Sequence, residues 1–87
     1  MSASREFELT IHAEERMRRR KISDEWVLQT LLNPDHVEFD PDDQTLEHRM
    51  AKIPTMDNRV LRVICRPAMQ PILVITVHFD RSMKGKL

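Results

Sequence analysis

Glycine is almost missing from this 87-residue chain, which has a single glycine, Gly85, near its end. Glycine-rich loops that cradle phosphates, as in Walker-type and dinucleotide-binding folds, are therefore excluded. One cysteine, Cys65, rules out an internal disulfide, and nothing else suggests secretion. The first residues have no signal-peptide core, and no apolar run approaches the roughly 20 residues of a membrane span. These absences predict a cytoplasmic protein with no membrane partner.

Net charge is also absent, because 14 Lys and Arg residues balance 14 Asp and Glu residues. This balance argues against a protein that binds nucleic acid by bulk electrostatic attraction, but it leaves room for a local cationic site. Ten of the cations are arginine, the residue suited to bidentate recognition of phosphate. Length and a hydrophobic content of 40% predict one domain over residues 1–87, with frayed ends at about residues 1–5 and 82–87.

Two helices are predicted before residue 35. Residues 10–20 are rich in good helix formers, with Thr10 as a candidate N-cap and arginines in the last turn. A second helix begins after Ser23, a candidate N-cap that two acidic residues follow. It ends at Asn33, because Pro34 disfavours helical geometry at the residue before it.

Four strands are predicted after the helices. Val37 and Phe39 alternate with polar neighbours, and further strands are expected at residues 45–53, 60–65 and 72–79. Short connections join these strands, which favours antiparallel pairing. The expected fold is therefore α+β, with two N-terminal helices packed on an antiparallel four-stranded sheet.

Alternation along the strands predicts which face of the sheet carries the helices. One face of residues 72–79 is wholly apolar, so the expected core contains Trp26, Val27, Leu31, Leu73, Ile75, Val77 and Phe79. In residues 45–53, Leu46 and Met50 favour the helix side. The opposite, open face would then gather Arg49, Arg62, Thr76 and His78.

The first helix carries a further basic cluster. His12, Arg16 and Arg20 recur at every fourth residue and fall within one ~80° arc beside the buried stripe. The alternative is a solvated helix edge with ordinary ion pairs. Arg62 also has two interpretations, an anion site or a side chain that pairs with Glu47 or reaches water. If the helix cluster is a site, Arg16 should be partly buried, with a carboxylate, a carbonyl or an anion at its guanidinium.

Metal binding and cysteine chemistry are not predicted. The four histidines are scattered, without the spacing of metal ligands. Cys65 lies in an apolar strand, where a thiol is usually inert. We therefore expect neither a metal ion nor a cofactor.

A motif in the first helix resembles that of a known family. Residues 12–23 read HAEERMRRRKIS and resemble the opening H-A-x-x-R-M-x-x-R-G-I-S of an uncharacterised family of small prokaryotic domains. The resemblance continues through residues 24–27, 31–35 and 74–77, and it departs at Lys21, where the family usually has glycine. That family is generally placed with the RelE-like fold of metal-independent ribonucleases, which includes colicin and barnase-like toxins. The resemblance thus implies a RelE-like fold and RNA cleavage.

The leading hypothesis is a toxin-like, metal-independent endoribonuclease, in which the 2′-hydroxyl of RNA attacks the adjacent phosphate. This reaction needs a base, an acid and cations around the phosphate. His12 and His78 titrate near neutral pH and are the candidate base and acid, with Arg16 and Arg62 as catalytic cations. The candidate substrate-binding residues are Arg20, Arg49, Thr76 and Arg81. The candidate partners are an RNA substrate and an antitoxin protein.

The alternative hypothesis is a small non-catalytic domain that binds a protein partner or forms a homodimer. Its surface would be the open face of the sheet, through Val60, Ile64, Ile72 and Val74. An apolar patch does not distinguish the two hypotheses, because a toxin would also need a surface that its antitoxin covers. Convergence of histidine and arginine in one cleft distinguishes the catalytic hypothesis.

Overall fold

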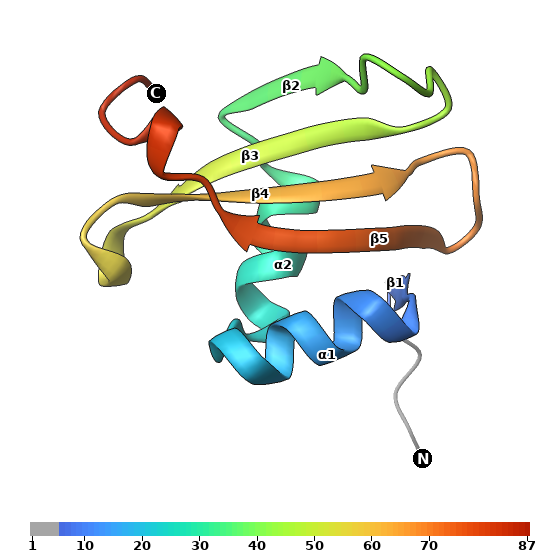
Figure 1. Ribbon diagram of the computed structural model, residues 1–87, viewed down its shortest axis with the longest axis horizontal. Coiled ribbons are helices and arrows are strands. Elements are labelled where there is room, and N and C mark those ends of the chain that lie inside the picture. The colour runs from blue at the N-terminus through green and yellow to red at the C-terminus, as the bar shows by residue number, and fades with distance from the viewer. Residues whose placement is uncertain (1–5) are drawn as a thin grey trace.

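The computed structural model describes residues 6–87, which form two helices and one five-stranded sheet (Figure 1). The predicted fraying of residues 1–5 lies outside the described residues. None of the described helices is long and apolar enough to cross a membrane. In chain order the elements are β1 (Phe7–Leu9), α1 (Ile11–Arg20), α2 (Asp24–Leu32), β2 (His36–Phe39), β3 (Glu47–Ile53), η1 (Pro54–Met56), β4 (Arg59–Arg66), β5 (Ile72–Phe79) and η2 (Arg81–Met83).

Both predicted helix caps are confirmed. The Thr10 hydroxyl accepts a hydrogen bond from the Ala13 amide at 3.0 Å, and the Ser23 hydroxyl accepts one from the Trp26 amide at 3.1 Å. Lys21 ends α1 in the left-handed conformation, with φ 58° and ψ 43°. This conformation costs a residue with a side chain about 1–2 kcal/mol, which explains why glycine suits the position.

The sheet is mixed and has five strands, in the order β1-β5-β4-β3-β2. The α+β class is confirmed, and the four strands β2 to β5 pair antiparallel with their neighbours. The prediction of a purely antiparallel four-stranded sheet is wrong, because β1 pairs parallel with β5, from Phe7 opposite Ile72 to Leu9 opposite Val74. Three residues are too short a run to be distinguished from coil by alternation.

A β-bulge in β5 changes which of its residues face the helices. The register runs from Thr76 opposite Ile64 to Val74 opposite Cys65, so Ile75 is an extra residue without an opposite partner. One extra residue reverses the alternation. Val74 is consequently fully buried in the helix-side core, while Leu73 and Ile75 are half-exposed.

The bulge corrects the predicted core at two positions. Leu73 and Ile75 are not part of the core, because the bulge interrupts the alternation along β5 on which the prediction depends. The other expected members are confirmed. Val27, Leu31 and Val77 belong to the buried cluster, and Trp26 and Phe79 pack against it.

The prediction that Arg49 lies on the open face is also wrong. Arg49 stands opposite Val63, a core residue, and directly opposite residues share a face of the sheet. Its guanidinium donates a hydrogen bond to the Leu31 carbonyl of α2 at 2.9 Å. Met50 and Val60 are buried on the open face. Because apolar side chains occur on both faces of the sheet, alternation predicts the wrong face for Arg49.

The two helices occupy different places on the sheet. α2 packs against β3 and β4, whereas α1 packs against β5 and runs along it close to the edge (Figure 1). The Thr10 hydroxyl fixes the start of α1 by donating to the Ile75 carbonyl at the bulge, at 2.8 Å. Because α1 lies at an edge, its side chains can meet residues from both the helix side and the open side of β5.

Candidate functional site

A cationic pocket of about 290 Å³ lies where α1, the end of β5 and the start of β4 meet. Six side chains line it, from four elements of the fold: Arg16, Arg20, Arg59, His78, Phe79 and Arg81. We call it the arginine pocket. It arises because β5 carries His78 towards the edge that α1 covers, and the chain then turns into η2 directly afterwards.

None of the four arginines of this pocket has a carboxylate within 4.0 Å among residues 6–87. Arg49 and Arg62, which also extend from strands, are both paired with acids. Four unpaired guanidiniums around one cavity repel one another, and an anion relieves that repulsion. The charge of the pocket suits a negatively charged ligand; Arg16 and Arg59 are partly buried, whereas Arg20 and Arg81 are exposed to solvent.

Arg16 meets one half of its prediction. Its side chain is partly buried, as expected for a residue that borders the core stripe of α1. The other half is not met, because no carboxylate or carbonyl of residues 6–87 bonds the Arg16 guanidinium.

His78 is the one imidazole of the arginine pocket, and it is half-buried. Burial lowers the pKa of His78 below its ordinary value of 6.5, and the positive charges of Arg62 and Arg16 lower it further, against an opposing effect of Asp80. Neither ring nitrogen has a hydrogen-bond partner within residues 6–87. At neutral pH this side chain is therefore a neutral imidazole that is free to accept a proton.

Arg62 stands opposite His78 in the sheet, but other groups occupy its guanidinium. Its Nε and Nη2 donate to the Asp80 carboxylate at 2.8 and 2.6 Å, and its Nη1 lies 2.7 Å from His48 Nδ1. Because arginine only donates, His48 Nδ1 must accept, and His48 Nε2 then donates to Asp40 at 2.6 Å. Arg62 is thus engaged in a partly buried network, which holds Asp80 beside the arginine pocket.

Asp80 is firmly ionised. The Ser82 hydroxyl is the main group that lowers the pKa of Asp80, from 3.8 to about 2; burial opposes this shift, and the Arg62 guanidinium and the Ser82 amide lower the pKa further. The Ser82 hydroxyl donates to the carboxylate at 2.6 Å and the Ser82 amide at 2.9 Å. The whole carboxylate is consequently engaged inside the chain.

The other predicted site residues lie outside the arginine pocket. His12 is exposed on the first turn of α1, and Thr76 stands opposite Ile64 on the open face. Arg49 faces α2 and also bonds Glu47 at 3.0 Å. The pocket thus brings together Arg16, Arg20, His78 and Arg81, and it leaves out His12, Arg49, Arg62 and Thr76.

Two pocket residues, Arg59 and Phe79, were not predicted as site residues. The Arg59 guanidinium lies over the Phe79 ring, 4.4 Å from its centroid. The register explains the contact, since Leu61 stands opposite Phe79 and Arg59 is two residues away on the same face. Cross-strand register was the missing signal, because the strand predicted from the sequence begins at residue 60, one position after Arg59.

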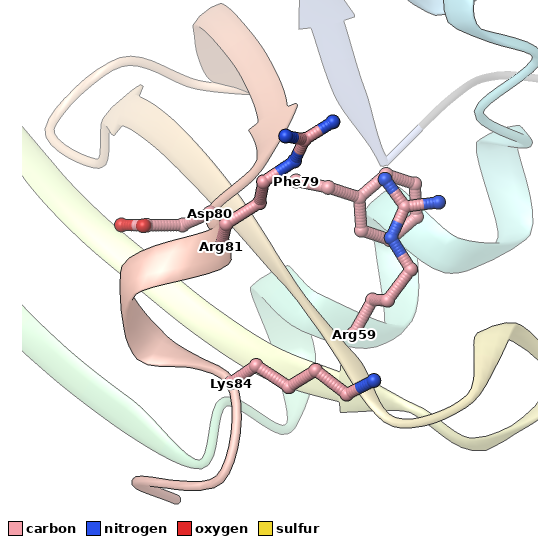
Figure 2. A pocket seen from close by; sticks show the side chains of 5 residues that line it. All are labelled: Arg59, Phe79, Asp80, Arg81 and Lys84. Carbon is pink, nitrogen blue, oxygen red and sulfur yellow. The ribbon is translucent and has the colours of Figure 1, made fainter.

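A second pocket of about 460 Å³ adjoins the arginine pocket (Figure 2). Arg59, Phe79 and Arg81 line both, and Asp80 and Lys84 complete the second. Lys84 pairs with Asp57 at 2.8 Å, but Asp57 is 88% exposed, so this ion pair is weak.

Neither metal chemistry nor thiol chemistry has a built site in the part of the chain that the structure describes. No group of three or more His, Cys, Asp or Glu side chains in residues 6–87 is placed to hold a metal ion. Burial raises the pKa of the Cys65 thiol to about 11, so this side chain remains protonated and unreactive at neutral pH.

The apolar set expected on the open face does not form a surface. Val60 and Val74 are 1% and 0% exposed, and Ile72 packs against the helix-side core. The open face carries the Asp40–His48–Arg62–Asp80 network instead.

Comparison with known proteins gave a family match. A family model described as a domain of unknown function (DUF4258) matches residues 9–79. The matched segment includes both helices, the strands β2 to β5 and every residue of the arginine pocket except Arg81. No curated protein and no solved structure matches the chain.

Proposed function

The chain belongs to the DUF4258 family of domains of unknown function, and we propose that it is a metal-independent endoribonuclease. The observation that carries the proposal is a neutral, half-buried His78 in the same pocket as four unpaired arginines. A phosphodiester is the biological anion whose cleavage needs this combination of a proton acceptor and several cations.

In the proposed reaction, the arginine pocket holds a phosphate of the RNA chain. His78 takes the proton from the adjacent 2′-hydroxyl, the 2′ oxygen forms a bond to phosphorus, and the bond from phosphorus to the 5′ oxygen breaks. Water protonates the leaving oxygen, since no second imidazole or carboxyl group lines the pocket. The products are a 2′,3′-cyclic phosphate and a 5′-hydroxyl.

The arginines act on the charge that develops during this step. The phosphorane-like transition state carries more negative charge than the substrate, and guanidiniums bind it through charge-assisted hydrogen bonds. Arg16 is the best placed of the four, because it is partly buried and acts electrostatically on His78. A RelE-like toxin role, in the cytoplasm and under the control of an antitoxin that covers the pocket, belongs to the same proposal.

The test is cleavage of a labelled oligoribonucleotide by the purified chain in EDTA. We expect products with a 2′,3′-cyclic phosphate, and a loss of ~10²–10⁴-fold in rate for His78→Gln. Arg16→Gln should be similarly impaired, whereas Arg19→Gln, an exposed position on the same helix, is the matched control. His12→Gln should retain activity, since His12 lies outside the pocket. Activity that disappears in EDTA, or equal losses at Arg16 and Arg19, would refute the mechanism.

A second candidate function is binding of a protein partner along β2. This strand is the edge of the sheet, all four of its residues are exposed, and Val37 and Phe39 are 44% and 68% exposed. An unpaired edge strand with apolar side chains can accept a strand from another chain. The test is the mass of the wild-type chain and of Phe39→Lys by light scattering. A wild-type dimer that Phe39→Lys abolishes, in a chain that cleaves no RNA, would support partner binding instead of the endoribonuclease.

A further inference from the structure

Arg59 lines both the arginine pocket and the second pocket. Its guanidinium lies over the Phe79 ring, and the ring of Phe79 in turn meets Trp26 edge-on, with centroids 6.1 Å apart at 69°. Figure 2 shows the Arg59 head group in front of the Phe79 ring, between Arg81 and Lys84. The Arg59 guanidinium thus lies on one aromatic ring, Phe79, which itself packs with Trp26 against the core.

A guanidinium braced in this way is a platform for a flat ligand. One side of Arg59 contacts Phe79, and the head group borders both cavities. Unstacked nucleobases bind on arginine planes as well as on aromatic rings. The volume of about 460 Å³ lies within the usual range for small-molecule sites.

We propose that the second pocket binds the nucleobase next to the phosphate held in the arginine pocket, stacked on Arg59. This inference rests on the proposed function and assigns its substrate class, which is single-stranded RNA. A base inside a duplex is stacked between its neighbours and cannot enter such a pocket.

The second pocket also predicts little preference between bases. Asp80 is its one acidic lining residue, and Arg62 and Ser82 already occupy the Asp80 carboxylate. Arg81 and Lys84 donate hydrogen bonds and are suited to phosphate oxygens rather than to one base edge. Stacking without edge recognition binds any base, because every base has a flat face.

The experiment measures binding of short 2′-O-methyl oligonucleotides, which lack the attacking hydroxyl, by fluorescence anisotropy at low salt. Three probes are compared: a single strand with bases, the same strand with abasic spacers at alternate positions, and the annealed duplex. We expect the wild-type chain to bind the abasic strand and the duplex at least about tenfold more weakly than the single strand.

Arg59→Lys separates stacking from charge, since lysine keeps the charge and lacks the flat guanidinium. This variant should bind the single strand and the abasic strand equally, whereas Arg19→Lys, the matched control outside both pockets, should keep the discrimination. Failure of the wild-type chain to bind any probe would refute the proposed function itself. Equal binding of base-containing and abasic strands, or discrimination that survives in Arg59→Lys, would refute only the stacking site.

Discussion

We predict that Asp80→Asn removes about 2 kcal/mol of the loss in free energy of unfolding that the wild-type chain shows as the pH falls. The pKa of Asp80 is about 2 in the folded chain, against an ordinary value of 3.8. At 1.36 kcal/mol for each pKa unit, this lowering corresponds to about 2 kcal/mol. The side chains of Arg62 and Asp80 are both 14% exposed, so solvent screens their pairing only slightly.

The sign of the effect follows from the lowered pKa. The folded state binds the ionised form more tightly, so this stabilisation is fully present above pH 3.8 and is lost as the pH falls towards 2. The asparagine variant does not titrate at this position. The free energy of unfolding of the wild-type chain should therefore approach that of the variant as the pH falls.

Urea unfolding, followed by circular dichroism at several pH values between 7 and 2, measures the difference directly. Asp57→Asn is the matched control, because Asp57 is exposed and pairs only with the flexible Lys84. A gap between wild type and Asp80→Asn that stays constant across this pH range would refute the assignment. The same pH dependence of the gap for Asp57→Asn would show that the partly buried Arg62–Asp80 pair has no special role.

Four further predictions concern stability and activity. Lys21→Gly should raise the free energy of unfolding by about 1 kcal/mol, and the melting temperature by ~4–8 °C, because glycine adopts the left-handed conformation without steric cost. Thr10→Val, which removes the N-cap and the bond to the carbonyl at the bulge, should cost about 1–2 kcal/mol in chemical unfolding. Val77→Ala should cost about 2 kcal/mol and more than Ile75→Ala, since only Val77 is fully buried; the reverse order in urea melts would contradict the bulge. The acid limb of kcat/KM for RNA cleavage should lie below pH 6.5, because the pKa of His78 is lowered, and a limb above that value would exclude His78 as the base.

Local signals in the sequence were sufficient for most of the secondary structure. Thr10 and Ser23 begin the helices as predicted, and the last strand spans Ile72–Phe79 in both the prediction and the structure. These features depend on caps and on uninterrupted β-branched residues, which act within a few positions of the chain.

Long-range features could not be predicted in the same way. The parallel pairing of β1 and the extra residue Ile75 depend on which segments meet in space. The spacing of residues every fourth position placed Arg16 and Arg20 together, but it could not show that α1 runs along β5 near its edge. Arg59 reaches the pocket through the register of β4 with β5, which no local pattern encodes.

The distance along the chain between the parts of the pocket has a consequence during protein synthesis. Thr10, which anchors α1, bonds a carbonyl 65 residues later, and His78 and Arg81 follow that carbonyl. α1 leaves the ribosome long before β5, so the arginines of α1 are synthesised before the other residues of the pocket. Contacts between residues so far apart in the sequence form slowly, because the entropic cost of closing the loop comes before the packing contacts that offset it. A nascent chain therefore has no assembled pocket until β5 and η2 have left the ribosome.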